Sequence, residues 1–367
     1  MKRICLCLYS AVHYRRSIFK LMDKEYDCEF NFVLSPTMVK QFDTNVLHGK
    51  VNKTWIKKIG KVTWHPGITG KSRGKFDYYI CSGSPYDFST WILLLKIWLF
   101  HPRKKLYFWT HGWYGKETAA TSLLKTIFFK LADGIILYGN HAKKMMIERG
   151  FDENNLFVIH NSLDYDRQLE IRTKLILSDI YTQHFGNNHH VIIFIGRLTP
   201  VKQLDILVKA VNILKEKGEY YNLVFIGDGP MKQQLSNLVD DLSMSELTWF
   251  FGECYDEQKN AELIYNADLC VAPGNIGLTA MHVMSFGCPA ISHNDFKWQM
   301  PEFEAIRSGE TGDFFERGNV NDLANAIHKW FIRHNDDRDK VRTECFREID
   351  ERWTPKYQMK ILKRIIV

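Results

Sequence analysis

The chain has 367 residues, of which 45% are hydrophobic and 25% are charged, and its formal net charge is +7. This composition excludes a disordered or collagen-like chain, and the length suits two globular domains better than one. No apolar run approaches the roughly 20 residues with which a helix spans a bilayer.

The first half of the sequence alternates between short apolar runs, typical of strands, and segments with helical spacing. Strands are expected at 3–9, 29–34, 78–81, 106–110, 134–138 and 156–160, with helices starting at 17 and covering 123–131 and 142–149. Cys5 and Cys7 should lie on one face of the first strand. The alternation favours a parallel sheet with helices on both faces.

The second half restarts this alternation after a polar segment that ends near Gly186. Strands are expected at 191–195, 223–226, 247–251, 269–272 and 290–292, with helices at 204–217, 235–242 and 279–286. We therefore predict an α/β protein with two doubly wound, Rossmann-like domains, 1–186 and 187–352, and a ligand cleft between them. Residues 353–367 are expected to form a helix that returns to the first domain.

Charge and cysteine usage indicate partners and compartment. Residues 1–150 hold 25 Lys and Arg against 10 Asp and Glu, whereas the remainder holds 24 against 32. A basic first half indicates an anionic partner, either a membrane surface, a phosphorylated acceptor or nucleic acid. The eight cysteines show no metal-ligand spacing and suit reduced, buried thiols in a cytoplasmic protein.

Two cations follow the strand at 191–195 and precede a predicted helix. They are Arg197 and Lys202, in Gly196-Arg197-Leu198-Thr199-Pro200-Val201-Lys202. A helix start offers free N–H groups, while arginine adds a hydrogen-bonding fork and lysine a point charge. This combination suits a diphosphate, although two solvated charges on an ordinary turn would give the same sequence.

Two glycine-containing loops follow other predicted strands. Pro273-Gly274-Asn275-Ile276-Gly277-Leu278-Thr279 leads into a helix whose first amides can point at phosphate oxygens, but an ordinary strand-to-helix loop is an equal alternative. Gly227-Asp228-Gly229-Pro230 lacks the third glycine of a dinucleotide fingerprint, so a tight turn is the preferred interpretation.

Together these segments resemble the retaining glycosyltransferases of family four, which have the GT-B fold. The resemblance covers nearly the whole chain, and its motifs are Gly196-Arg197-Leu198 with Lys202, Gly227-Asp228-Gly229-Pro230, Phe251-Gly252, Gly277-Leu278, Gly287-Cys288-Pro289, Pro301-Glu302 and Thr311-Gly312. It implies transfer of a hexose-type sugar from a nucleotide-diphosphate donor to a hydroxyl of a glycan or lipid-linked acceptor. It also implies retention, no metal and no other cofactor, and a place in polysaccharide biosynthesis, such as that of bacterial lipopolysaccharide or capsule.

The resemblance also implies roles for individual residues. Arg197 and Lys202 would hold the donor diphosphate and stabilise it as it leaves. His111, in Trp109-Thr110-His111-Gly112, would lie beside the transferred sugar, with a structural loop histidine as the alternative. The remaining donor-binding residues would be Gly252, Glu253, Cys254, Asn275, Gly277, Leu278, Thr279 and His282.

The sequence departs from the family at two places. Family members usually carry two glutamates eight positions apart, where this chain has Gly274 and His282. His282 can still hydrogen-bond a ribose, but the carboxylate contact to the sugar is missing. The loop at 10–16 lacks the family's glycine pair, and its basic side chains suit either a phosphate-bearing acceptor or a solvated helix start; these candidate acceptor residues are His13, Tyr14, Arg15 and Arg16.

Residues 90–100 are almost wholly apolar and are followed by Pro102-Arg103-Lys104-Lys105. This pattern fits an interfacial segment on anionic lipid or a buried helix with a basic end, so the protein is expected in the cytoplasm, peripheral on the inner face of the plasma membrane. Two other functions stay open, a sugar-nucleotide epimerase and a catalytically inactive glycan- or nucleic-acid-binding module. No nucleic-acid motif is recognised, so no nucleic-acid partner is expected.

Overall fold

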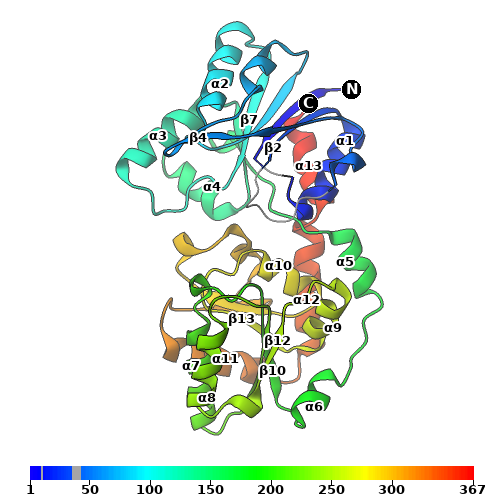
Figure 1. Ribbon diagram of the computed structural model, residues 1–367, viewed down its shortest axis with the longest axis vertical. Coiled ribbons are helices and arrows are strands. Elements are labelled where there is room, and N and C mark those ends of the chain that lie inside the picture. Colours follow the sequence, from blue (N-terminus) through cyan, green and yellow to red (C-terminus); the bar gives the residue numbers. More distant parts are fainter. Residues whose placement is uncertain (10, 35–42) are drawn as a thin grey trace. The chain divides into compact units, whose positions relative to one another are not determined.

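The computed structural model describes residues 1–9, 11–34 and 43–367 and divides into two compact units. Unit 1 comprises Met1–Asp164 and Thr354–Val367, and unit 2 comprises Tyr165–Trp353. Each unit is built around its own parallel sheet with helices on both faces (Figure 1). Ser10, the first residue of the predicted acceptor loop, lies outside the described residues.

The sheet of unit 1 has seven strands, all paired in parallel. Their spatial order is β3 (Lys50–Trp55), β2 (Asp27–Leu34), β1 (Arg3–Leu8), β6 (Tyr78–Ser82), β7 (Lys105–Thr110), β8 (Gly134–Leu137) and β9 (Leu156–Val158). The six strands expected in this half are all present. Strand β3 and the antiparallel pair β4 (Lys57–Ile59) and β5 (Val62–Trp64) were not predicted, because their lysines and exposed positions obscure the apolar pattern.

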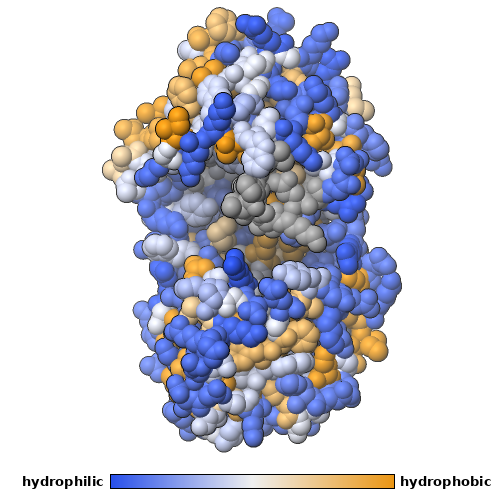
Figure 2. Space-filling model, in the orientation of Figure 1, coloured by the Kyte–Doolittle hydropathy of each residue, from blue (hydrophilic) through white to orange (hydrophobic). Residues whose placement is uncertain are grey.

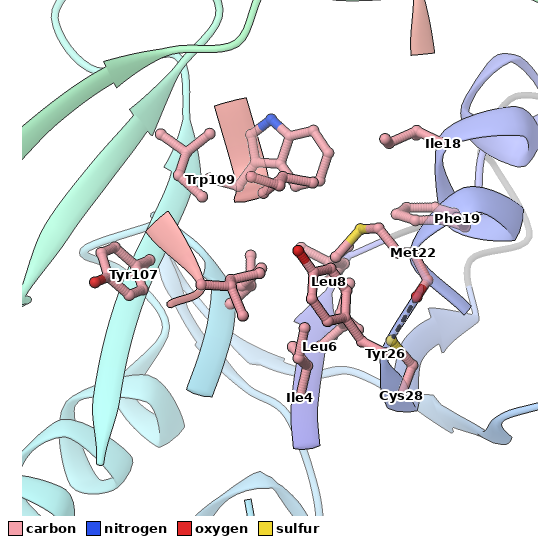
Figure 3. Packing of buried hydrophobic residues seen from close by; sticks show 14 of the residues in the cluster. Ile4, Leu6, Leu8, Ile18, Phe19, Met22, Tyr26, Cys28, Tyr107 and Trp109 are labelled. Atoms are coloured by element: carbon pink, nitrogen blue, oxygen red, sulfur yellow. Dashed lines mark hydrogen bonds between the residues drawn. The ribbon is translucent and has the colours of Figure 1, made fainter. Parts of the chain in front are cut away.

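Alternation along β1 distributes its side chains between two cores. Ile4, Leu6 and Leu8 pack in a cluster with α1 (Arg16–Glu25) and α13 (Pro355–Ile365), part of which Figure 3 shows. Cys5 and Cys7 belong to the opposite cluster, with α2 (Phe88–Phe100), α3 (Ala119–Lys130) and α4 (Asn140–Ile147). The period of two in a strand therefore confirms the predicted shared face of Cys5 and Cys7.

The sheet of unit 2 has six parallel strands in the order β12 (Thr248–Gly252), β11 (Tyr221–Ile226), β10 (His190–Ile195), β13 (Leu269–Ala272), β14 (Ala290–His293) and β15 (Gly312–Phe315). The order reverses at β10 and β13, which is where open α/β sheets bind ligands. The helices of this unit are α5 (Tyr165–Arg172), α6 (Ile180–Phe185), α7 (Leu204–Glu216), α8 (Lys232–Asp241), α9 (Glu257–Asn266), α10 (Leu278–Ser285), α11 (Val320–Arg333) and α12 (Arg338–Arg352).

The contacts divide the chain after Asp164 and not near Gly186. The predicted linker instead contains α5 and α6, which are held to α9 by side chains: Gln168 Nε2 donates to Glu257 Oε1 at 2.9 Å, and Tyr181 Oη donates to the Leu263 carbonyl at 2.7 Å. This segment is polar and only weakly periodic, so its packing against α9 could not be predicted from the sequence. Residues 354–367 group with unit 1, where α13 packs beside α1.

Candidate functional site

In unit 2, the loops after β10, β11 and β13 pack backbone against backbone at the carboxyl edge of the sheet. A Cβ atom added to Gly227 would lie 2.0 Å from the Gly196 carbonyl oxygen, and one added to Gly274 would lie 2.0 Å from that of Val201. The Gly274 N–H donates to the Lys202 carbonyl at 2.9 Å. Glycine is therefore required at both positions by close approach. The predicted tight turn at Gly227 serves this packing.

Lys202 connects two of these loops through its ammonium group. It ends the 3₁₀ helix η5 (Pro200–Lys202), and its Nζ donates to the Asn275 carbonyl at 2.6 Å and to Asn275 Oδ1 at 2.9 Å. Burial lowers the pKa of Lys202, while the negative charge of Glu302 acts in the opposite direction. The predicted cation of the first loop thus lies against the segment that leads into α10.

The start of α10 is held in place by Ser292 of β14 and by Gln299, which follows that strand. Gly277 is the N-cap, and the Ile276 N–H donates to Gln299 Oε1 at 3.0 Å. Ser292 Oγ donates to the Ala272 and Gly274 carbonyls at 2.8 and 3.2 Å and accepts from Gln299 Nε2 at 2.8 Å. The first-turn N–H groups of a helix, here those of Leu278 and Thr279, have no partner within the helix. Sequence reasoning missed Gln299 and Ser292, which carry no recognisable motif.

Two predicted donor-binding segments lie nearby on the same sheet edge. Arg197 is the second residue after the end of β10. Its side chain is exposed and forms no ion pair with any described residue. After β12, the Cys254 carbonyl accepts from Asn260 Nδ2 at 3.1 Å, which ties this loop to α9, and Glu253 is exposed. Gly252 accepts from the Gly227 N–H at 2.8 Å, so the β12 loop is linked to the β11 loop.

His282, in the last turn of α10, is paired with a carboxylate from another helix. Its Nε2 lies 3.2 Å from Glu257 Oε1 on α9, at ion-pair distance but without the alignment of a hydrogen bond. Although burial raises the pKa of Glu257, the neighbouring His282 ring and the hydrogen bond from Gln168 lower it below the ordinary value. Sequence reasoning missed Glu257, because nothing in the sequence joins α9 to α10.

In unit 1, His111 follows β7 and is surrounded by aromatic rings. Its ring centroid lies 4.7 Å from that of Tyr138 and 5.7 Å from that of Tyr114. Its Nδ1 is buried and has no hydrogen-bond partner in the described part of the chain. Burial, followed by the charges of Arg15 and Lys125, lowers the pKa of His111 to about 4. The imidazole is therefore neutral at pH 7.

Arg15 joins His111 at this edge of the sheet. It lies in the 3₁₀ helix η1 (His13–Arg15), and its guanidinium carbon is 4.6 Å from the Trp109 ring centroid and 5.2 Å from that of Tyr138. Burial lowers the pKa of Arg15 to about 10, so it remains a cation at neutral pH. Of the other predicted acceptor residues, His13 and Arg16 are exposed and Tyr14 is half-buried.

A buried ion pair supports the loop that carries His111. Lys125 Nζ donates to Glu117 Oε1 at 2.7 Å and to the Gly112 carbonyl at 2.9 Å. Glu117 also accepts from the backbone N–H groups of Tyr114 and Gly115, each at 2.9 Å. Although burial raises the pKa of Glu117, the hydrogen bonds from Lys125 and Tyr114 lower it below the ordinary value. These residues position the loop, and sequence reasoning did not single them out.

Comparison with known proteins identifies the family to which unit 2 belongs. Residues 182–344, all within unit 2, match the family model of glycosyl transferases group 1.

Unit 2 is a group 1 glycosyl transferase domain.

Two curated relatives agree with this assignment of the glycosyl transferase domain. The chain is 22% identical over 195 residues to a poly(ribitol-phosphate) α-N-acetylglucosaminyltransferase of Staphylococcus aureus, a match that covers 51% of this chain and only 38% of that relative. It is 26% identical over 298 residues to the uncharacterized glycosyltransferase MJ1059 of Methanocaldococcus jannaschii, covering 75% of this chain and 71% of that protein.

Solved structures extend the likeness to both units. The Anabaena protein HepE, solved in complex with UDP, has a TM-score of 0.71 at 17% identity and covers 100% of this chain and 99% of its own. The apo lipopolysaccharide outer core galactosyltransferase WaaB has a TM-score of 0.73 at 14% identity, covering 99% of both chains. At these identities the likeness concerns the fold, and it confirms the predicted GT-B class.

The structure brings some of the predicted site residues together within each unit. In the glycosyl transferase domain, Lys202, Asn275 and Gly277 lie on connected loops, and Thr279 Oγ1 donates to the Ile195 carbonyl at the end of β10 at 3.2 Å. In unit 1, the predicted residues that meet are His111 and Arg15. Their roles toward substrates remain predictions.

Proposed function

We propose that this chain transfers a hexose-type sugar from a nucleotide-diphosphate donor to a hydroxyl of a glycan or lipid-linked acceptor. The contact of Lys202 Nζ with Asn275, which joins the loop after β10 to the start of α10, carries the proposal. It gathers a cation and the first-turn amides of a helix at one edge of the sheet, and both attract phosphate oxygens. HepE, which shares the fold, has been solved with UDP and with UDP-glucose, so UDP is the donor nucleotide that we propose to test first.

The proposed chemistry relies on stabilising the leaving group. As the bond between the anomeric carbon and the diphosphate breaks, negative charge develops on the phosphate oxygens, where Arg197, Lys202 and the amides of Leu278 and Thr279 would receive it. In the proposed retaining reaction, the acceptor hydroxyl bonds to the anomeric carbon from the side that the diphosphate leaves. A departing phosphate oxygen takes the hydroxyl proton. Because two side-chain cations supply the positive charge, we propose that no metal is needed.

Unit 1 would bind the acceptor. Arg15 supports this proposal, because it stays charged while stacked on Trp109 and Tyr138 and can bind a phosphate or hydroxyl group. His111, neutral at pH 7, would hydrogen-bond a sugar hydroxyl without adding charge. The Staphylococcus aureus relative is named for poly(ribitol-phosphate) and WaaB for the lipopolysaccharide outer core, which supports a surface polysaccharide as the proposed product. We propose the cytoplasmic side of the membrane as its place of synthesis.

Nucleotide binding and turnover test the proposal directly. Calorimetric titration with UDP, GDP, CDP and TDP identifies the base, and turnover is then measured with the corresponding sugars, with and without a chelator. We expect Arg197→Ala and Lys202→Met each to lower kcat/KM by about 100-fold or more with unchanged melting temperature. Lys209→Met is the matched control, because Lys209 lies on the surface of α7 and pairs with Asp205 of the same helix. Near-normal turnover in both site variants would exclude this site.

A second candidate, a nucleotide-sugar-binding module without transferase activity, is favoured by Gly274. The backbone leaves no room for a side chain there, so the carboxylate that family members place against the sugar is absent. Such a module would bind the nucleotide sugar and leave it intact when supplied with acceptor glycans. A transferase releases free nucleoside diphosphate and an extended acceptor, so product analysis by mass spectrometry separates the two.

A further inference from the structure

The outer surface of α2 in unit 1 is apolar and exposed. The helix buries Leu93, Leu94 and Ile97, yet Trp98, Leu99 and Phe100 on its last turn are 67%, 59% and 70% exposed. Lys96 is the only charged residue among the thirteen of this helix, and its Nζ donates to the Thr69 carbonyl. A surface helix of a soluble domain normally presents polar residues on its outer side, so this helix lacks the side chains that water would favour.

Two neighbouring elements extend this apolar surface. On α3, Leu123, Ile127 and Leu131 follow one another at helical spacing and are 63%, 50% and 37% exposed, and Trp91 of α2 packs on Phe128 of α3 with ring centroids 4.9 Å apart. At the β4–β5 hairpin, Ile59 and Val62 are 84% and 50% exposed. We define the apolar face of unit 1 as the exposed apolar residues of α2, α3 and this hairpin. Figure 2 shows apolar side chains along the margin of unit 1 over α2 and α3.

Cations without an ion-pair partner in the described part of the chain flank the apolar face. Three lysines surround the apolar tip of the hairpin, and three further basic residues lie near the last turn of α2. The basic residues near α2 are held there because Lys104, which follows that helix, binds the neighbouring segment. Its Nζ donates to the Ser72 carbonyl at 2.7 Å and to the Gly74 carbonyl at 2.5 Å. All six are exposed: Lys57, Lys58, Lys61, Arg73, Lys75 and Arg103.

We propose that the apolar face docks on a lipid bilayer surface that carries anionic headgroups. Trp98, Leu99 and Phe100 would enter the interface between headgroups and acyl chains, and the flanking cations would contact lipid phosphates. Charge decides between lipid and a second copy of this chain, because a symmetric dimer would bring the same six cations against themselves. In the described part of the chain no helix is long and apolar enough to cross a bilayer, so the proposal is surface attachment. It does not depend on the transfer reaction.

Vesicle sedimentation with the full chain tests the proposal. One set of vesicles contains phosphatidylcholine alone, and the other contains phosphatidylcholine mixed with phosphatidylglycerol. We expect sedimentation with the anionic set, weakened by added salt. The combined variant Trp98→Ser, Leu99→Ser, Phe100→Ser should lower the partition coefficient by about tenfold or more, and Lys57→Glu with Lys58→Glu should remove the preference for anionic vesicles. If the combined variant fails to fold, the single variant Trp98→Ser replaces it in the same experiment.

Matched controls come from unit 2. Ile332→Ser removes an apolar side chain that is 66% exposed, and Lys329→Glu reverses an exposed charge on the same helix. Both should bind vesicles as the original chain does. The proposal is overturned if the original chain does not sediment with anionic vesicles or if the Ser variants bind equally well. It is also overturned if sedimentation equilibrium shows a dimer that the combined Ser variant converts to monomer, since a second copy would then cover the face.

Discussion

His282 Nε2 lies 3.2 Å from Glu257 Oε1, and Gln168 Nε2 donates to that same oxygen at 2.9 Å. The three side chains come from α10, α9 and α5, so a carboxylate from one helix stands beside the position where family members carry their second glutamate. The sequence shows a histidine in place of that glutamate. The fold shows that a carboxylate accompanies the histidine.

Removing the Glu257 carboxylate should weaken nucleotide binding. Glu257→Gln removes the carboxylate that lies beside His282 Nε2, so the ring is less firmly oriented and a ribose contact made through His282 is lost or misaligned. We expect about tenfold weaker binding of the donor nucleotide, and a similar loss for His282→Ala, by isothermal titration calorimetry. Glu262→Gln is the control, because Glu262 lies on the same helix α9 but pairs with Lys259. Equal affinities in all three variants would show that the pair plays no part in binding.

A side chain at Gly274 should destabilise unit 2. The added Cβ would lie 2.0 Å from the Val201 carbonyl oxygen. This oxygen belongs to the backbone, which cannot rotate away as the end of a flexible side chain can. We expect Gly274→Ala to lower the free energy of unfolding by about 3 kcal/mol, measured by urea denaturation. Gly274→Glu, which restores the family's residue, should unfold more easily still. Gly70→Ala, in open space, should leave stability unchanged.

Asn275 should control the position of the Lys202 ammonium. Asn275→Ala removes one of the two acceptors of Nζ and leaves the backbone carbonyl. We therefore expect kcat/KM to fall by about tenfold, a smaller loss than for Lys202→Met. Asn237→Ala on α8 is the control, because Asn237 Oδ1 accepts from Gln233 of the same exposed helix surface. A loss as large as that of Lys202→Met would contradict the supporting role and make Asn275 a direct ligand.

The sequence predicts those parts of the structure that depend on local periodicity. Alternation in the run that contains Cys5 and Cys7 predicted β1 and the shared face of these two cysteines. Helical spacing predicted α7, which buries Leu207 and Val211. The loop glycines and the cations Arg197 and Lys202 predicted which edge of the unit 2 sheet carries the candidate site. Polar contacts between different elements were not predictable, because such pairing leaves no periodic pattern in the sequence. Examples are the contacts of Glu257 with His282, of Lys125 with Glu117, and of α5 with α9.

The buried pair of Glu117 and Lys125 should be needed for the stability of unit 1. Their side chains are 6% and 13% exposed. Glu117→Gln leaves the ammonium buried without its counter-charge, so we expect the free energy of unfolding to fall by about 3 kcal/mol, measured by urea denaturation. Adding Lys125→Met should recover part of the loss, because no unpaired charge then remains. Glu170→Gln, which breaks the exposed pair with Lys174, is the control and should leave stability unchanged.

The lowered pKa of His111 should make stability depend on pH. Burial lowers this pKa to about 4 in the folded chain, from an ordinary value of 6.5. Between these values the unfolded chain binds a proton that the folded chain does not, so stability falls as pH falls from about 6.5 to about 4 and is insensitive to this group above pH 6.5. His111→Gln carries no titrating ring and should give a shallower decline in melting temperature over this range.

The histidines His65 and His293 have pKa values that burial lowers to about 4 in the same way, so part of the pH dependence should remain in the His111→Gln variant. His13→Gln, which replaces an exposed histidine of the same unit, is the matched control. If His111→Gln reproduces the pH profile of the original chain, the imidazole is solvated in the folded chain. A neutral imidazole at pH 7 could then not be assumed in the acceptor site, because a solvated histidine titrates close to neutrality.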